Sequence, residues 1–473
     1  MRFLIGIDNG SQSTKVSIFD ESGNVMSEAR QSLRPSDSPR PGVVEHPDDD
    51  LWETIGEACR RAMAGFKGDV KDIAGIGLCT IRFCRAHLRE DGSLASPVMS
   101  WMDDRVSRPY EQRDSAVRYV TTSSGYITHR LTGQFKDTVA NYQGVWPINT
   151  DRWDWLRDDE GFGEYGIRRD MLFELVMPGD LLGTITAEAA QHCGIPEGLP
   201  VVATANDKAV EALGSGLRSP GTLLVSLGTY IASMTVGHDN QNSDAFWSNF
   251  GSRPHIYLYE SPGIRRGMWT VSWWRDLLGD ELMRHAGERG ISVDALLDEE
   301  AAKVPAGSEG LLVTLDWLAP TNAPYRRGSI LGFDVRHGQY HIYRAIIEGI
   351  VLTIYQKASA MARELNREFD RIVVSGGGSN SDVFMQAFAD AFNLPTSRCA
   401  IRDGAGLGSA IYASVGLGIH SSWDDAIDRM VTCEEAFTPN ELVHDLYQRL
   451  SVIHGQITTS TDNLYRQIFE LFN

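Results

Sequence analysis

The chain has 473 residues, more than one domain usually holds, which predicts at least two folded units with substantial cores. Hydrophobic residues make up 42% and charged residues 23%, so collagenous, repetitive and disordered chains are excluded. The formal net charge of -19 argues against nucleic acid as a partner, although backbone amides in a local cleft can still bind phosphate groups.

The six cysteines show no C-x-x-C pair and no zinc-finger spacing, so reduced thiols and a cytoplasmic location are expected. The apolar stretch Phe3 to Ile7 is too short for the h-region of a signal peptide and reads as a first strand. No apolar run reaches the roughly 18 residues that a membrane span requires. A membrane is therefore not expected as a partner.

The first half of the chain alternates predicted strands and helices. Residues 2–29 contain short apolar runs separated by turn residues, a pattern typical of an antiparallel meander. Residues 48–66 begin with an acidic start signal and place apolar residues at helical spacing, and residues 73–78 read as a buried strand. This alternation predicts an α/β protein.

The second half repeats the order of strand, hydroxyl-rich turn and strand at residues 223–235. Seven polar residues at 238–244 form the best linker candidate, and we place the domain boundary there. The predicted units are an N-terminal domain at 1–240, a C-terminal domain at 241–440 and a helical extension at 441–473. Within the second unit we expect a helix at 341–368, a strand at 372–375 and a helix from residue 382.

Three glycine-bearing turns, at residues 8–15, 226–229 and 376–379, each follow an apolar strand. Such turns expose backbone amides to phosphate oxygens, and Lys15 adds positive charge to the first. A Walker A loop is excluded because the chain has no Gly-Lys dipeptide. Each turn alone is also explained as an ordinary tight turn.

Asp207 follows the apolar strand 199–202, inside the motif Asn206-Asp207-Lys208. A carboxylate at a strand end that faces a cleft can accept the proton of an attacking hydroxyl. The alternative is that Asp207 caps the N-terminus of a helix.

Taken together, these motifs resemble the FGGY carbohydrate kinases over nearly the whole chain. The segments that carry the resemblance are Ile5 to Ser11, Trp101 to Arg105, His129 to Gly133, Asn206 to Lys208, Ser226 to Thr229, the positions Gly332, His341, Ile342, Ala345 and Glu348, and then Ser375 to Ser379 and Ala405 to Gly408.

The resemblance implies a two-lobed, duplicated actin-like ATPase fold of the ribonuclease H-like type, with ATP and sugar in the cleft between the lobes. It implies transfer of the γ-phosphate of ATP to a hydroxyl of a sugar, polyol or sugar acid, with ATP and Mg²⁺ as cofactors and a homodimer as the candidate assembly. The alternative function is that of an actin-like ATPase or nucleotide-sensing protein without sugar phosphotransfer.

The resemblance also assigns roles by position. Asp207 resembles the catalytic base, and Asp8 resembles the carboxylate near the metal. The expected ATP phosphate contacts are Asn9, Gly10, Ser11, Ser13, Thr14, Lys15, Gly228 and Thr229. The expected adenosine contacts are Gly376, Gly377, Gly378 and Ser381, and the expected substrate contacts are Arg82, Trp101, Asp103 and Asp207.

The chain departs from the family pattern at the substrate side. The segment between Arg105 and His129 is several tens of residues shorter than in typical members. Ile81-Arg82-Phe83 matches neither the Gln-Met-His of xylulokinases nor the Arg-Glu of glycerol kinases. We expect Arg82 to favour an acidic or heavily hydroxylated substrate. The alternative is that Arg82 pairs with Asp103 or another acid and touches no ligand.

Overall fold

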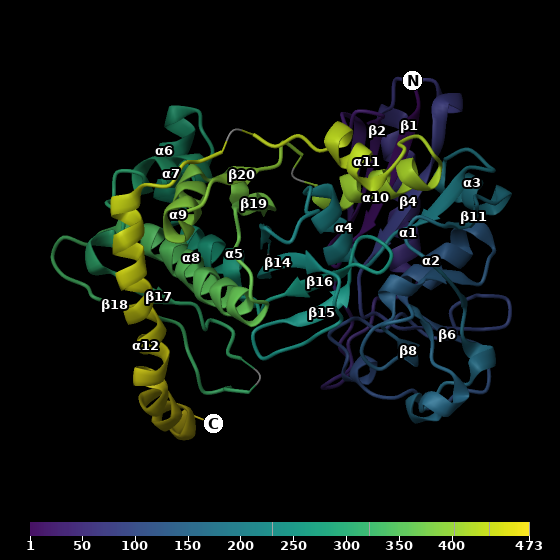
Figure 1. The fold of residues 1–473 in the computed structure, drawn as a ribbon, viewed down its shortest axis with the longest axis horizontal. Coiled ribbons are helices and arrows are strands. Elements are labelled where there is room, and N and C mark those ends of the chain that lie inside the picture. The colour runs from purple at the N-terminus through teal and green to yellow at the C-terminus, as the bar shows by residue number, and fades with distance from the viewer. Residues whose placement is uncertain (229, 321, 402, 435, 473) are drawn as a thin grey trace.

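The computed structural model describes residues 1–228, 230–320, 322–401, 403–434 and 436–472. Two six-stranded sheets form the centres of two lobes (Figure 1). The first sheet has the order β11-β12-β4-β1-β2-β3, with β1 Phe3–Asn9, β2 Ser13–Asp20, β3 Val25–Ser32, β4 Ile73–Thr80, β11 Leu181–Thr184 and β12 Pro200–Ala203. The second has the order β15-β16-β14-β13-β19-β20, with β13 Thr222–Leu227, β14 Ile231–Gly237, β15 Trp247–Phe250, β16 Tyr257–Glu260, β19 Arg371–Ser375 and β20 Thr396–Arg398.

The two sheets repeat one pattern of strand pairing. Strand β1 pairs antiparallel with β2 and parallel with β4, just as β13 pairs antiparallel with β14 and parallel with β19. The turns after β1 and β13 therefore occupy equivalent places in the two lobes. The α/β alternation and the duplicated turns expected from the sequence are confirmed.

Helices cover both sheets. In the first lobe these are α1 Asp50–Gly65, α2 Ser123–Thr132, α3 Ala187–Cys193 and α4 Asp207–Gly214. In the second they are α5 Gly267–Leu277, α6 Gly279–Arg289, α7 Val293–Ala301, α8 Gln339–Glu364, α9 Asp382–Phe392 and α12 Glu441–Phe472. The helix α12 packs on α8 and α9 at the outer edge of the second lobe (Figure 1). None of the helices in the described ranges has the length and apolar character needed to cross a membrane.

Four two-stranded sheets complete the described part of the chain. They pair β5 Ala86–Leu88 with β6 Tyr119–Thr121, β7 Lys136–Thr138 with β10 Glu174–Val176, β8 Ile148–Asn149 with β9 Asp154–Trp155, and β17 Leu312–Thr314 with β18 Ser329–Leu331.

The lobe boundary lies earlier than the boundary expected at residue 240. Strands β13 and β14 precede that residue, yet both belong to the second sheet. The polar run 238–244 is the connection from β14 to β15, and it is polar because connections run over the surface. The change of sheet falls in the segment between α4 and β13.

The chain returns to the first lobe after β20. The helices α10 Gly404–Gly416 and α11 Trp423–Met430 follow that strand, and α10 packs against β1, β4 and α4 (Figure 1). The expected C-terminal domain therefore contributes helices to the first lobe, and the lobes are joined at more than one place.

Glycines let α10 approach its neighbours at backbone distance. A Cβ on Gly408 would lie 2.1 Å from the carbonyl oxygen of Val210 in α4, and one on Gly77 of β4 would lie 1.9 Å from that of Ser409. Real Cβ atoms do not approach backbone so closely. The helices α4 and α10 and the first sheet can therefore pack this closely only because glycine has no side chain.

We expect Gly408→Ala to lower the free energy of unfolding by about 1 to 3 kcal/mol, because the added methyl meets backbone that cannot move aside. The matched control is Gly287→Ala in α6, where nothing lies within 4 Å of the added Cβ. The control should raise stability by up to about 1 kcal/mol. Urea denaturation measures both changes. A Gly408→Ala variant as stable as the unmodified protein would contradict the close contact.

Candidate active site

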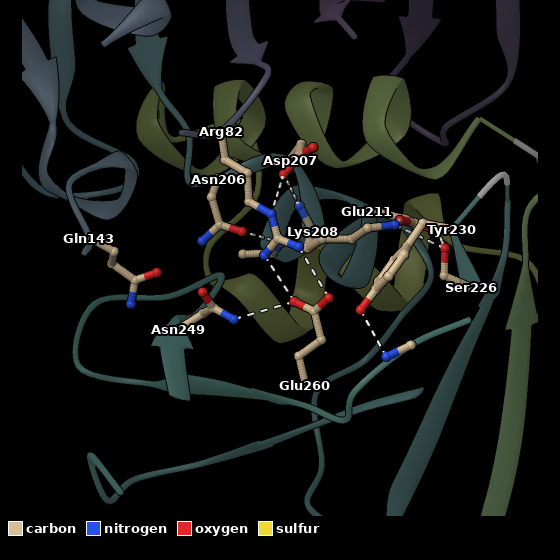
Figure 2. A network of polar contacts seen from close by, with 12 residues as sticks. Arg82, Gln143, Asn206, Asp207, Lys208, Glu211, Ser226, Tyr230, Asn249 and Glu260 are labelled. Atoms are coloured by element: carbon tan, nitrogen blue, oxygen red, sulfur yellow. Dashed lines mark hydrogen bonds and ion pairs between the residues drawn. The ribbon is translucent and has the colours of Figure 1, made fainter. Parts of the chain in front are cut away.

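Asp207 is the first residue of α4, directly after the end of β12. The N-cap of this helix is Asn206, whose side chain accepts a hydrogen bond from the backbone N–H of Ala209 at 3.1 Å. The cap role that the sequence allowed for Asp207 therefore belongs to its neighbour. The carboxylate of Asp207 is 32% exposed and lies 3.4 Å from Nε of Arg82 (Figure 2).

Arg82 follows β4 and joins the two lobes. Its Nη1 and Nη2 donate to the two carboxylate oxygens of Glu260 at 2.9 and 3.1 Å (Figure 2). Glu260 is the last residue of β16 in the second sheet, and its side chain is fully buried. Arg82 therefore pairs with an acid, and that acid is Glu260 rather than Asp103. A contact of Arg82 with a ligand stays a prediction.

A second polar link connects α4 to the second lobe. Nζ of Lys208 donates to Glu211 at 2.8 Å. The other carboxylate oxygen of Glu211 accepts from the hydroxyls of Ser226 and Ser375, each at 2.7 Å. These serines lie on β13 and β19, the strands that lead into the two glycine turns of the second lobe. The start of α4 is thereby held against both turns.

The two carboxylates of α4 differ in acidity. Burial raises the pKa of Asp207, Arg82 and Lys208 partly offset this, and Glu260 and Glu211 add to the rise. Burial also acts on Glu211, but Lys208 and the serine hydroxyls outweigh it and lower its pKa. Asp207 is thus the carboxylate suited to accept a proton, while Glu211 stays ionised in its hydrogen bonds.

In the first glycine turn the tip is exposed and the side chains on either side of it are buried. Ser11 is exposed, whereas the side chains of Asn9, Ser13 and Thr14 are buried. Nδ2 of Asn9 donates to the Thr14 hydroxyl at 2.7 Å, and Nε of Arg30 donates to the Ser13 hydroxyl at 2.9 Å. The side chains of Asn9, Ser13 and Thr14 are thus engaged in hydrogen bonds within the first lobe, and Asn9 and Thr14 face each other across β1 and β2.

Acidic residues crowd behind this turn. Nζ of Lys15 lies 3.8 Å from Asp8 and 3.5 Å from Asp403 at the start of α10. Burial and the charge of Asp403 raise the pKa of Asp8 to about 7, against the opposing effect of Lys15, and Asp207 and Glu211 contribute further. Within the described ranges no three His, Cys, Asp or Glu side chains form a ready-made metal site.

The second-lobe turns lie side by side. A Cβ on Gly376 would lie 2.7 Å from the carbonyl oxygen of Leu227, so the end of β13 and the loop after β19 touch through backbone. Beside Gly377 there is open space, and a Cβ on Gly378 would meet Leu227 and Met268. Gly228 has no atom closer than 3.7 Å to an added Cβ, while Thr229 lies outside the described residues.

Two residues that were expected to contact a ligand make hydrogen bonds with other residues of the protein. The Ser381 hydroxyl caps α9 and donates to Asp298 at 2.8 Å. Asp103 is buried, and its carboxylate accepts from Arg105 and from the backbone N–H of Val44. These bonds hold the loop around Asp103, and a substrate contact by this residue stays a prediction.

Two aromatic side chains are exposed, Phe83 next to Arg82 and Trp101 further along the chain. The ring centroid of Phe83 lies 5.2 Å from the Arg82 guanidinium, and its backbone has a φ of 64°, which is unusual for a bulky residue. Trp101 is 50% exposed. An exposed Trp and a strained Phe are the features that a sugar-binding surface would use.

Glu260 and Glu211 are the site residues that sequence motifs missed. Glu211 lies on the amphipathic helix α4 and Glu260 on the fully buried strand β16, and neither belongs to a glycine turn. The sequence feature that could have pointed to Glu260 is its position as a charged residue directly after the apolar run Tyr257 to Tyr259.

The raised pKa of Asp8 predicts a pH-dependent stability. An unfolded Asp titrates near 3.8 and the folded Asp8 at about 7, so the free energy of unfolding falls as pH rises between these values and stays lower above 7. Asp8→Asn cannot titrate. We expect its Tm, relative to the unmodified protein, to increase from about pH 4 to about pH 8 in metal-free buffer. A constant Tm difference across this range would contradict the crowding of carboxylates.

Comparison with known proteins places the chain among sugar kinases. The models of the N-terminal and C-terminal domains of the FGGY family of carbohydrate kinases match residues 3–112 and 106–214, and residues 223–417. The chain is 46% identical to the uncharacterized sugar kinase YgcE of Escherichia coli (strain K12), covering 100% of this chain and 96% of that protein. It is 24% identical to a xylulose kinase of Lactococcus lactis over 99% of both chains.

A solved structure shows the same fold. The crystal structure of xylulose kinase from Rhodospirillum rubrum superposes with a TM-score of 0.83 at 23% identity, covering 98% of this chain and 100% of that chain. The duplicated sheets are therefore those of the two-lobed actin-like ATPase fold.

Proposed function

This chain belongs to the FGGY family of carbohydrate kinases, and from that premise we propose that it transfers the γ-phosphate of ATP to a hydroxyl of an uncharged sugar or polyol, with Asp207 as general base. Members of the family are phosphotransferases with an alcohol group as acceptor. The observation that carries the proposal is the position of Asp207 at the start of α4, partly exposed and in contact with Arg82.

The proposed step moves one proton and one phosphoryl group. Asp207 accepts the proton of the acceptor hydroxyl as its oxygen bonds to the γ-phosphorus, and the bond from that phosphorus to the β,γ-bridging oxygen of ATP breaks. The proton on Asp207 then leaves to solvent. Arg82 orients the carboxylate through Nε, and Asn206 fixes the start of the helix. Phosphoryl transfer depends mostly on such positioning and on charge stabilisation.

The turns at Gly10 and Gly228 would hold the ATP phosphates through their backbones, and the open space beside Gly377 would take the nucleoside. The donor set fits Mg²⁺, since Asp8 and Asp403 crowd carboxylates together and Mg²⁺ prefers oxygen ligands from one or two carboxylates plus phosphates. When bound, the ion would neutralise phosphate charge. Without the ion, Lys15 offsets part of the negative charge of Asp8 and Asp403.

The charge of the site supports an uncharged acceptor. The terminal nitrogens of Arg82, which would grip a substrate carboxylate as a fork, already hold Glu260, and Lys208 holds Glu211. With Asp207 also present, three carboxylates face two cations. A sugar acid would add a fourth negative charge there. The expectation for Arg82 was an acidic or heavily hydroxylated acyclic substrate, and of these two we propose the neutral, hydroxylated one.

Asp207→Asn should keep the fold and the affinity for ATP while lowering kcat by about 10² or more, because it removes the proton acceptor and little else. The measurement is ADP release across a panel of sugars and polyols, with nucleotide affinity followed by calorimetry. Turnover within about tenfold of the unmodified enzyme on its best substrate would place the base elsewhere.

Glu260→Gln should free the fork of Arg82 and shift the enzyme toward acids. The unmodified enzyme should have a higher kcat/KM for the neutral member of each pair of alditol and aldonate with the same carbon chain. In the variant, the ratio of kcat/KM for the alditol to kcat/KM for the aldonate should fall by about tenfold or more, since the freed guanidinium of Arg82 can make a charge-assisted bond to the aldonate carboxylate.

The matched control is Glu348→Gln, which breaks another buried Arg–Glu pair, to Arg344 at 2.8 Å, within α8. It should leave the preference unchanged even where it lowers Tm. An unmodified enzyme that prefers the aldonates would contradict the neutral acceptor while leaving the kinase reaction in place.

A further inference from the structure

A cavity lies outside the candidate active site, in the segment between residues 85 and 117. Its volume is about 210 Å³, and its lining includes Arg85, His87, Ser96 and Tyr110, further arginines, and the carboxylates Glu111 and Asp114. It shares no lining residue with the network of Arg82, Asp207 and Glu260. Part of the lining lies between Arg105 and His129, the segment that we expect to be shorter than in typical members of the family.

Arg85 brings a buried charge to this cavity. The residue is 3% exposed, and its Nη atoms donate to the backbone carbonyls of Arg105 and Arg108, each at 3.1 Å. No ion pair among the described residues includes Arg85, although the charge of Asp103 acts on it from a greater distance, and the Trp146 ring lies 5.4 Å from its guanidinium. A buried cation without a directly paired anion is costly, so a negative ligand in the cavity would stabilise it.

Burial lowers the pKa of Arg85 to about 10, which still leaves it charged at neutral pH. Burial, together with Arg85 and Arg105, lowers the pKa of His87 to about 4. His87 is therefore a neutral ring that can donate one hydrogen bond.

Unsatisfied polar atoms gather around the same cavity. Four of the lining residues each have a buried polar atom without a hydrogen-bond partner in the described structure: Nε of Arg85, Nε2 of His87, Oγ of Ser96 and the hydroxyl of Tyr110. Buried polar groups in native proteins nearly always have partners. Four orphans around one cavity therefore point to a polar ligand that the protein is built to receive.

We propose that this cavity binds the phosphate group of a small molecule. The four arginines in the lining outnumber its two carboxylates, Glu111 and Asp114, so a cation is disfavoured. A planar carboxylate is best held by a two-pronged guanidinium, but the Nη atoms of Arg85 are engaged with backbone carbonyls. Single donors on four separate side chains suit the tetrahedral oxygens of a phosphate, and Arg108 at the exposed rim adds positive charge.

The position of the cavity connects it to the active-site wall. An isolated β-bridge pairs Arg85 with Met99, two residues before the exposed Trp101. A ligand on Arg85 therefore contacts the segment that carries a proposed substrate residue. The phosphate can come from free inorganic phosphate or from a phosphorylated sugar.

The test measures binding to the full chain without ATP. Inorganic phosphate and a hexose phosphate are added in separate arms, against potassium chloride of equal ionic strength and the unphosphorylated hexose. We expect a rise in Tm and calorimetric binding with one or both phosphates and with neither control. Binding by both identifies free phosphate as sufficient, and binding by the hexose phosphate alone identifies a sugar phosphate.

Three variants locate the site. Tyr110→Phe should weaken phosphate binding by about fivefold or more, without lowering the Tm of the ligand-free protein, because its hydroxyl has no partner to lose. Arg85→Gln should abolish binding. Gly228→Val, at the proposed ATP turn, should leave it intact.

Absence of binding to the unmodified protein would overturn the proposal. Equal binding by Tyr110→Phe would also overturn it, and that variant decides the question if Arg85→Gln does not fold. Loss of binding in Gly228→Val with retention in Tyr110→Phe would place the phosphate at the ATP turn and overturn the proposal as well.

Discussion

Backbone contact between α10, α4 and the first sheet is the constraint on which the rest of the molecule depends. It exists only because Gly77, Gly214 and Gly408 have no side chains to hold these elements apart. The contact brings three pieces from distant parts of the chain to one point: Asp8 at the end of β1, Asp207 at the start of α4 and Asp403 at the start of α10. The acidic centre of the candidate site is thus a consequence of close packing.

Such a centre is unfavourable unless its charges are paired. Arg82 of the first lobe pairs with Glu260 of the second. Lys208 pairs with Glu211 on the same helix, and Glu211 in turn accepts a hydrogen bond from Ser375 on a strand of the second lobe. At Asp8, burial and the charge of Asp403 outweigh Lys15, so its pKa rises to about 7. In the proposed reaction, a divalent cation beside Asp8 would relieve this repulsion, and Asp207 would take up the proton.

Local patterns in the sequence predicted the strands, the three glycine turns and the position of Asp207, because each depends on residues that are neighbours along the chain. They did not predict Glu260, which pairs with Arg82 across 178 positions. Nor did they show that Asn9 and Thr14 turn inward, since that follows from the register of β1 against β2. The domain boundary was misplaced for a similar reason: polarity marks surface connections, and a connection between two strands of one sheet is as polar as a linker.

Two arginines three positions apart show how context decides chemistry. Arg82 and Arg85 are both largely buried, yet the first has its terminal nitrogens on a carboxylate and the second has them on backbone carbonyls. A guanidinium already neutralised by Glu260 can position Asp207 and meet hydroxyl groups, but it has no spare charge for an acid. Arg85 donates to carbonyls and has only the more distant charge of Asp103 to offset its own, so the proposed site supplies it with an anion from a ligand. The same residue type therefore argues for a neutral ligand on one side of this segment and for a phosphate on the other.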